Sequence, residues 1–438
     1  MKPRPEGGAA STGAAARRVA LDLLHRVLRR RQPLDETLDA HPGIEALAGR
    51  DRAFAYTLAA TTLRRLGQID ALVDHCLSRP LGDQAETVHD ILRLGICQLV
   101  FLETPPHAAI HTSVELAKRR RQVRHLGLIN AVLRRVSREG AAVIAGQDAA
   151  RLNTPDWLWQ SWTGAYGAET CRDIAAAHLV EPHTDLTAKG DPDELAQQVD
   201  GRIVAAGTVR VDHRGPIIGL PGFATGDWWV QDAAAALPAR LLGEVHGRHV
   251  IDLCAAPGGK TAQLAAAGAR VTAVDRSPRR LARLADNLTR LGLSAETVSA
   301  DALAWRPPAL ADAVLLDAPC SATGTIRRHP DVARIKTPED VAMLVSAQKQ
   351  LLRAATEMLA AGGLLVYSVC SLQPEEGPDV VSAAGAENDQ LAVERLDPAV
   401  IGGIGGWVTP EGALQTLPCH LADEGGMDGF FAVRLRRA

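Results

Sequence analysis

The stretch HVIDLCAAPGGKTAQLAAAGARVTAVD occupies residues 249–275 and predicts the centre of an α/β fold. Its apolar run at 250–253 predicts a buried strand, and residues 260–267 predict a helix after a turn of Pro and Gly. A second strand is predicted over 270–274, and it ends on Asp275. This order is typical of half of a doubly wound sheet, which binds ligands at the carboxyl ends of its strands.

Three kinds of ligand compete for this glycine-rich turn. A P-loop is matched by Gly259, Lys260 and Thr261, but Cys254 stands where the first glycine belongs. A dinucleotide site requires G-x-G-x-x-G, which is absent. S-adenosylmethionine (SAM) needs a carboxylate for its ribose, here Asp275, and no pyrophosphate cradle. SAM therefore fits without a missing residue.

Further strands and helices alternate after this stretch, which favours a mainly parallel sheet. Strands are predicted over 296–300, 312–316, 364–369 and from 428 onward, and helices over 278–291 and 338–361. The ends of the first three strands carry Asp301, Asp317 and Cys370, and Cys320 follows Asp317 by three residues. A single carboxylate at a strand end often caps a helix, and a single cysteine often only fills space in the core. Two thiols and three carboxylates at one sheet edge favour a reaction site.

Two thiols beside a SAM-type site indicate methylation of carbon 5 of a pyrimidine. That carbon is a poor nucleophile until a thiolate adds to carbon 6, after which it can attack the sulfonium methyl group. A base then removes the carbon 5 proton and the thiol leaves. The attacking thiol needs a depressed pKa, and Asp317 is expected to hydrogen-bond the ring. An amine methyltransferase would need no thiol.

Length and composition indicate a soluble protein of two or three domains. The chain has 438 residues, of which 46% are hydrophobic, 23% charged and 3% aromatic. Its seven cysteines form no C-x-x-C or Cys/His cluster, so neither zinc nor another metal site nor a disulfide framework is supported. Residues 1–14 predict a disordered lead without an apolar signal core, and no run is long enough to span a membrane. We expect a cytoplasmic monomer.

The region 15–140 predicts an all-helical domain with a basic character. Residues 1–140 carry 22 Lys+Arg and 15 Asp+Glu, whereas the remainder of the chain carries 26 and 36. Arginine clusters occur at 29–31, 118–124 and 134–138. They are either solvated helix ends or phosphate contacts, and the excess of positive charge suggests nucleic-acid binding.

Two further segments complete the predicted organisation. Residues 141–152 predict a linker, and 150–230 a small α+β domain with a strand at 184–188 and a helix at 192–199. Trp228 and Trp229 follow, and their pairing suits core packing better than base stacking. The α/β domain is predicted over 231–438.

Several motifs carry a resemblance to a known family. They are VQD at 230–232, CAAPGGKT at 254–261, DAPCSATGT at 317–325, RRHPD at 327–331, SVCS at 368–371 with QPEEG after it, and DGFF at 428–431. With them the sequence resembles the bacterial 16S rRNA cytosine-C5 methyltransferases of the Sun (Fmu) type. The helical region, with DRAFAYTLAATTLRRLGQID, is similar to the RNA-binding NusB fold.

The resemblance implies a multidomain protein with an all-α NusB-like domain, a small α+β domain and a C-terminal Rossmann-like SAM-dependent methyltransferase domain. It implies that the loop around SAM consists of Cys254, Ala255, Ala256, Pro257, Gly258, Gly259 and Lys260. It further implies ribose binding by Asp275, contact with the adenine side by Asp301, and a place for Asp317 between SAM and base. Cys370 is implied to be the nucleophile and Cys320 to assist product release; the residues alone favour Cys320 as the attacking thiol.

The sequence departs from the family pattern at two places. Val369 stands where a threonine usually precedes the nucleophile, and 332–334 lack a tryptophan that usually follows RRHPD. Neither departure removes a reacting group, but both affect substrate positioning. The sequence therefore predicts a SAM-dependent RNA cytosine-C5 methyltransferase acting on 16S rRNA, naked or in an assembling small subunit. The alternatives are a non-catalytic RNA-binding or ribosome-assembly factor and a P-loop nucleotide hydrolase.

Overall fold

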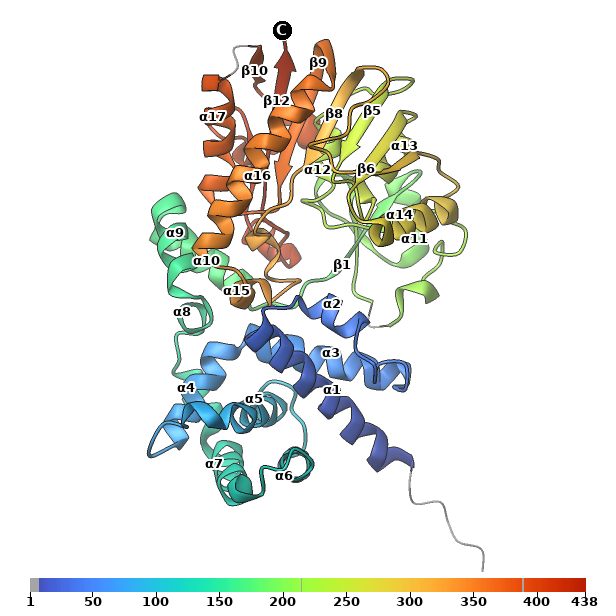
Figure 1. Cartoon of the computed structure of the whole chain (residues 1–438). Helices are drawn as coiled ribbons and strands as arrows, with labels where there is room; N and C mark the ends of the chain where they lie inside the picture. Colours follow the sequence, from blue (N-terminus) through green and yellow to red (C-terminus); the bar gives the residue numbers. More distant parts are fainter. Residues whose placement is uncertain (1–7, 214, 388–389) are drawn as a thin grey trace, which may run out of the picture. The chain divides into compact units, whose positions relative to one another are not determined.

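The computed structural model describes residues 8–213, 215–387 and 390–438 and separates into two compact units (Figure 1). Unit 1 comprises the chain up to Leu179 together with Ile326–Lys336. Unit 2 comprises Val180–Thr325 and Thr337–Ala438. No helix within the described part of the chain is long and apolar enough to cross a membrane.

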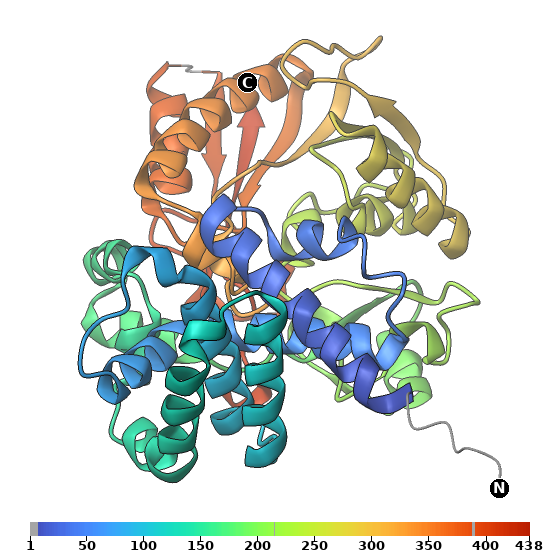
Figure 2. The same cartoon turned by 60° about the horizontal axis from the view of Figure 1, so that its bottom comes forward.

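Unit 1 is all helical, as the sequence predicts. Its main helices are α1 (Gly8–Arg30), α2 (Leu34–Asp39), α3 (Gly49–Arg64), α4 (Leu66–Cys76), α5 (Glu86–Val100), α6 (Pro106–Arg119), α7 (Leu126–Ala145), α8 (Ala149–Asn153), α9 (Asp156–Tyr166) and α10 (Ala168–Ala177). These helices are coloured blue to teal in Figure 2. Helix α5 contacts α1, α3, α4, α6 and α7. It is buried on nearly every side, as a central helix must be.

The segment 326–336, which holds the RRHPD motif, is anchored among the helices of unit 1. The Arg31 guanidinium donates to the Ile335 carbonyl at 2.9 and 2.6 Å, and the Leu34 backbone N–H donates to the Asp331 carboxylate at 3.0 Å. The Arg64 guanidinium donates to the Arg327 carbonyl at 2.8 Å. Short helix α15 (Val332–Ile335) therefore belongs to the helical unit, although its neighbours in sequence lie in the α/β unit.

Unit 2 contains a small antiparallel sheet and a large mixed sheet. The small sheet has the order β2 (Arg202–Ile203), β3 (Val209–Val211), β1 (Thr184–Ala188), β4 (Trp228–Val230), with α11 (Pro192–Val199) beside it. Trp228 and Trp229 are both buried, in accord with core packing. The buried Arg210 guanidinium donates two hydrogen bonds to the buried Asp185 carboxylate, at 2.7 and 2.8 Å. It also donates to the carbonyls of Glu424 and Gly426. Sequence-distant parts of unit 2 are thereby joined.

The large sheet carries the predicted α/β core. Its order is β10 (Leu391–Glu394), β12 (Phe430–Arg437), β9 (Leu359–Val369), β8 (Ala311–Asp317), β5 (His249–Leu253), β6 (Arg270–Asp275), β7 (Glu296–Ser299), with β11 (Leu414–Thr416) paired to β12. The five strands from β9 to β7 are parallel, whereas β10, β11 and β12 pair antiparallel. The carboxyl ends of β6, β8 and β9 therefore lie at one edge.

Helices cover both faces of this sheet (Figure 1). Val250 packs in the core with α12 (Leu237–Arg240) and α13 (Gly259–Ala266), whereas its neighbour Ile251 packs in the opposite core with α16 (Pro338–Glu357). Helix α14 (Pro278–Leu291) lies on the α13 side and α17 (Pro378–Glu387) on the α16 side. Successive side chains of β5 enter opposite cores because a strand has a two-residue period, and the strand is buried on both faces.

Several predicted boundaries are wrong, and each has a local reason. The predicted linker 141–152 is mostly helix, since α7 continues to Ala145 and α8 follows. Helix α16 ends at Glu357, before the predicted stop, because β9 already pairs with β8 at Leu359.

Two predicted domain limits also differ from the compact units. Of the predicted disordered lead, residues 1–7 lie outside the described residues, whereas α1 begins at Gly8. The predicted middle domain 150–230 divides at Leu179, because α8–α10 contact the helices of unit 1 or one another and β1–β4 form the small sheet of unit 2.

We predict that Arg210→Met lowers the free energy of unfolding of unit 2 by about 3–5 kcal/mol, because it removes one partner of a buried ion pair, the guanidinium that faces the buried Asp185 carboxylate. Urea unfolding followed by tryptophan fluorescence measures the change. Arg202→Met is the matched control, since its ion pairs with Asp212 and Glu424 are solvent-exposed and worth only about 0–1 kcal/mol. Equal losses in the two variants would contradict the assignment.

Candidate active site at the carboxyl edge of the large sheet

The edge formed by the ends of β6, β7, β8 and β9 collects most of the predicted site residues. Asp275 ends β6, Asp317 ends β8, and Cys370 directly follows β9. Asp301 lies two residues beyond β7, which pairs with β6 up to Ser299. Parallel alignment of these strands brings the four side chains to one edge, as the sequence predicts.

Asp275 is buried and rigidly held. One carboxylate oxygen accepts the Ala256 backbone N–H at 3.1 Å and the other accepts the Ser277 backbone N–H at 2.9 Å. The Arg280 guanidinium lies 3.6 Å from the first oxygen. The carboxylate is thus fixed to the loop 254–260 by the backbone of Ala256. Asp301 is exposed and accepts the Leu303 backbone N–H at 2.9 Å, a contact that also suits a turn cap.

Asp317 lies between an ammonium group and a hydroxyl group. Lys260 Nζ donates to its Oδ2 at 2.7 Å, and Ser368 Oγ donates to its Oδ1 at 2.9 Å. The Phe430 ring lies 5.1 Å from Lys260 Nζ, a cation–π distance. Asp317 therefore connects the glycine-rich turn, β8 and β9. Sequence reasoning placed Asp317 and Lys260 at the site but missed Ser368 and Phe430, although both lie in motifs it quoted.

The two candidate thiols meet. Cys320 Sγ lies 3.4 Å from Cys370 Sγ, although 50 residues separate them in sequence. The pKa of the Cys320 thiol is held well above its usual range, first by its hydrogen bond with Cys370, then by burial and by the negative charges of Cys370 and Glu376. Cys320 is therefore held in the thiol form at neutral pH.

Backbone contacts join the loops that carry these thiols. Gly324 N–H donates to the Cys370 carbonyl at 3.0 Å, and Gly429 N–H donates to the Gly324 carbonyl at 2.8 Å. A Cβ on Gly324 would lie 2.0 Å from the Gly429 carbonyl oxygen, so only glycine permits this approach. The TGT and DGFF motifs are thus parts of one packed structure.

The glycine-rich turn places a third thiol at the edge, with a different character. Cys254 adopts a left-handed conformation with φ of 60°. Burial, reinforced by the charges of Asp317 and Asp275, raises the pKa of its thiol to about 12. A thiol of that pKa is a poor nucleophile at neutral pH, so Cys254 is a structural part of the loop.

Asp252 is a buried titratable group that sequence reasoning missed, since it reads as an ordinary strand residue. Its Oδ2 accepts the Thr261 hydroxyl at 2.6 Å. Burial raises its pKa from 3.8 to about 7, although the Thr261 hydrogen bond opposes that rise. Its side chain therefore ties β5 to α13 behind the glycine-rich turn.

The two departures from the family pattern lie in different units. Val369 is buried within the apolar core beneath α16. Its methyl groups pack there, at the position where the family usually has a threonine hydroxyl. Val332 and Ala333 are buried in α15 of unit 1, and the Arg334 guanidinium donates to the Asn153 carbonyl at 2.7 Å.

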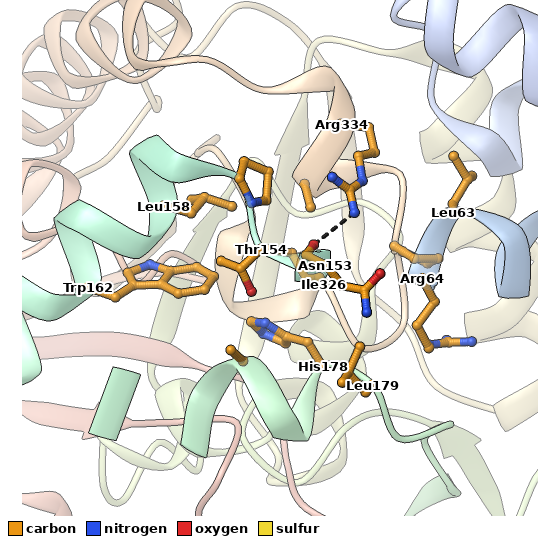
Figure 3. Close-up of a pocket in the computed structure, with 14 residues that line it drawn as sticks. Leu63, Arg64, Asn153, Thr154, Leu158, Trp162, His178, Leu179, Ile326 and Arg334 are labelled. Carbon is orange, nitrogen blue, oxygen red and sulfur yellow. Dashed lines mark hydrogen bonds between the residues drawn. The ribbon is translucent and has the colours of Figure 1, made fainter. Parts of the chain in front are cut away.

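A small cavity in unit 1 lies beside this segment (Figure 3). Arg64, Asn153, His178 and Arg334 are among its lining residues, and the dashed line in Figure 3 marks the bond from Arg334 to Asn153. Burial lowers the pKa of His178 to about 3, so its imidazole is neutral. None of the predicted site residues lines this cavity.

Comparisons with known proteins match two parts of the chain to two different families. Residues 239–436 match the family model described as 16S rRNA methyltransferase RsmB/F, and residues 14–138 match the NusB family. A solved structure described as a methyltransferase homolog protein from Pyrococcus horikoshii is 26% identical, with a TM-score of 0.55, covering 66% of this chain and 98% of that one. The fold and site therefore define a methyltransferase with an N-terminal NusB domain.

Full-length relatives identify the family. Ribosomal RNA small subunit methyltransferase B of Sodalis glossinidius is 37% identical over 96% of both chains. The protein of the same name from Salmonella agona is 35% identical over 96% of this chain and 98% of its own. The chain belongs to the RsmB/F family of 16S rRNA methyltransferases, as the motifs predicted.

We predict that Asp252→Asn stabilises the protein at pH 8 by about 1–4 kcal/mol, with the gain shrinking as the pH falls toward 4. The raised pKa means that the fold favours the protonated carboxyl, so wild-type stability is lost as pH rises through about 7. Thermal denaturation between pH 4 and 8 measures this. The control is Asp286→Asn, on the exposed side of α14; the same pH-dependent gain in both variants would refute the prediction.

Proposed function

We propose that this chain transfers a methyl group from SAM to carbon 5 of a cytosine in 16S rRNA through a covalent bond between Cys370 and carbon 6. The observation that carries the proposal is the pair of thiols, 3.4 Å apart, at the same sheet edge as Asp317. Methyl transfer to an amine or a hydroxyl needs no thiol, whereas carbon 5 requires a nucleophile at carbon 6. The proposed substrate is naked rRNA or an assembling small subunit, in the cytoplasm.

The residues at the edge fit SAM by their chemistry. Asp275 presents a carboxylate, fixed by two backbone N–H groups, that suits a ribose diol. The loop 254–260 leads into the N-terminus of α13, and Asp301 would lie on the adenine side. When bound, SAM supplies the methyl group.

The chain's own residues hold the base and move its protons. Asp317, oriented by Lys260 and Ser368, would hydrogen-bond the cytosine ring. Cys370 would add to carbon 6 as a thiolate, and this bond makes carbon 5 nucleophilic. After methylation a base takes the carbon 5 proton, the electrons of that C–H bond form the carbon 5–carbon 6 double bond again, and the Cys370 sulfur leaves carbon 6 as a thiolate. Cys320 would assist this release.

The target cytosine must leave its stack to admit a thiol below its plane. Unit 1 would bind the surrounding RNA through phosphate contacts and shape. Arg119 and Arg121 lie at and just beyond the end of α6 and are exposed, whereas Arg120 donates to the Asp22 carboxylate on α1. The exposed pair therefore suits phosphate contact better than Arg120.

We predict that Cys320→Ser accumulates a denaturation-resistant protein–RNA adduct, whereas Cys370→Ser forms neither adduct nor methylated product. The reason is that Cys370 makes the bond to carbon 6 and Cys320 assists its cleavage. Labelled rRNA and SAM are incubated with each variant and resolved on a denaturing gel. Cys76→Ser, in α4 of unit 1, is the control and should methylate normally.

Each other outcome has a definite meaning. An adduct in Cys370→Ser but not in Cys320→Ser would show that Cys320 is the nucleophile and that Cys370 assists its release. Normal methylation by both variants would refute thiol catalysis. Wild-type RNA binding and ribosome maturation without any methyl transfer would favour the non-catalytic assembly factor.

We predict that the double replacement Arg119→Gln and Arg121→Gln weakens RNA binding but leaves SAM binding within about twofold. Each lost phosphate contact should reduce the slope of log affinity against log salt by roughly 0.7–0.9. Filter binding at several salt concentrations and calorimetry with SAM measure the two effects. Arg79→Gln, which removes an exposed arginine outside the clusters, is the control; equal loss of RNA and SAM binding would refute the division of roles.

A further inference from the structure

The side chain of Glu376 lies between the two loops that carry Cys320 and Cys370, and the reaction proposed above assigns it no role. Glu376 is fully buried at the end of the 3-10 helix Pro374–Glu376. An ionised carboxylate in the interior is costly unless hydrogen-bond donors surround it. The groups that donate hydrogen bonds to Glu376 therefore indicate which parts of the site its carboxylate holds in place.

The carboxylate of Glu376 accepts hydrogen bonds from the residue that follows each cysteine. Its Oε1 accepts the Ser321 backbone N–H at 2.8 Å. Its Oε2 accepts the Ser371 hydroxyl at 2.5 Å and also the Ser321 hydroxyl. The two hydroxyl oxygens are 3.0 Å apart, and both serines are buried. One carboxylate thus joins the backbone beside Cys320 to the loop beside Cys370.

A second residue extends this link to the other side of Cys320. Gln348 Nε2, from α16, donates to Glu376 Oε1 at 3.0 Å and to the Pro319 carbonyl at 2.9 Å. The Tyr367 hydroxyl donates to the Glu376 carbonyl at 2.5 Å and fixes its backbone to β9. The residues before and after Cys320 are therefore both tied, directly or through Gln348, to one buried carboxylate.

We propose that Glu376 is a positioning residue that sets the separation of the Cys320 and Cys370 sulfur atoms for the two-thiol reaction. This inference rests on the proposed function for its role in the reaction, but the positioning itself can be measured without RNA. The second glutamate of the QPEEG motif, Glu376, thus holds the loops of the two thiols together. The first, Glu375, is exposed.

The charge of Glu376 has a second effect, on the protonation of Cys320. It adds to the hydrogen bond with Cys370 and to burial in raising the pKa of the Cys320 thiol. Replacing the carboxylate by an amide would remove that charge but keep the size of the side chain. The amide oxygen can still accept from Ser321 N–H and Gln348, and the amide NH₂ can donate to the serine hydroxyls.

The first test measures how closely the thiols are held in the full-length protein. Wild type, Glu376→Gln, Glu376→Ala and the control Glu375→Gln are equilibrated with reduced and oxidised glutathione. Each exchange converts two thiols and one oxidised glutathione into the protein disulfide and two reduced glutathiones. Peptide mapping by mass spectrometry gives the fraction of the Cys320–Cys370 disulfide, and hence the effective concentration of one thiol at the other.

We expect the effective concentration to fall at least about tenfold in Glu376→Ala, to stay within about threefold in Glu376→Gln, and to be unchanged in Glu375→Gln. SAM binding by calorimetry checks that unit 2 is folded. If Glu376→Ala does not fold, Ser371→Ala, which removes one hydroxyl but leaves the carboxylate, should lower the effective concentration by about threefold.

The second test measures methylation. Glu376→Ala should lower kcat by about 100-fold with KM for SAM within about twofold, whereas Glu376→Gln should keep kcat within about fivefold. In Glu376→Gln the limb of the pH–rate profile that reports Cys320 should move to lower pH, which a merely structural side chain would not cause. Glu375→Gln should leave the profile unchanged.

The two tests separate this inference from the proposed function. An unchanged effective concentration in both Glu376→Ala and Ser371→Ala overturns the positioning role, whatever the methylation results. A different result would support the positioning role but overturn the proposed reaction. In it, the wild type forms the disulfide, Glu376→Ala does not, and the wild type transfers no methyl group.

Discussion

The contact between the loop after β8 and the loop after β9 is the constraint on which the candidate site depends. Neither loop alone holds the two thiols, since Cys320 comes from one and Cys370 from the other. Backbone bonds at Gly324, the hydroxyl groups of Ser321 and Ser371, and the carboxylate of Glu376 hold them together. The site is therefore as rigid as this buried polar network, in which every member must be satisfied.

Asp317 connects this network to the cofactor side of the edge. Its carboxylate receives Lys260 from the helix after the glycine-rich turn and Ser368 from β9, so a shift in either strand would move it. Asp275, at the end of β6, is fixed to the same turn by the Ala256 backbone. The family's motifs thus mark residues that contact one another across strands rather than separate functional parts.

The segment 326–336 gives the chain an organisation that is not colinear with its domains. It directly follows the Cys320 loop in sequence but packs with the helices of unit 1, through Arg31, Leu34 and Arg64. Short-range patterns could not indicate this, because the partners are more than 260 residues away in sequence. The same holds for the division of the predicted middle domain at Leu179, which long-range contacts decide.

The sequence by itself determined the fold class, the parallel core of the large sheet, and the family. Strand and helix periods and turn residues are local, so β1, α11 and α14 were predicted at their observed bounds. It also placed Asp275, Asp317, Cys320 and Cys370 at one edge, because parallel strands align their ends. Only the tertiary structure decided that the sulfur atoms meet, that Glu376 and Asp252 are buried beside the site, and that α16 gives way to β9 at Leu359. Each of these depends on packing between segments distant in sequence, which no local pattern encodes.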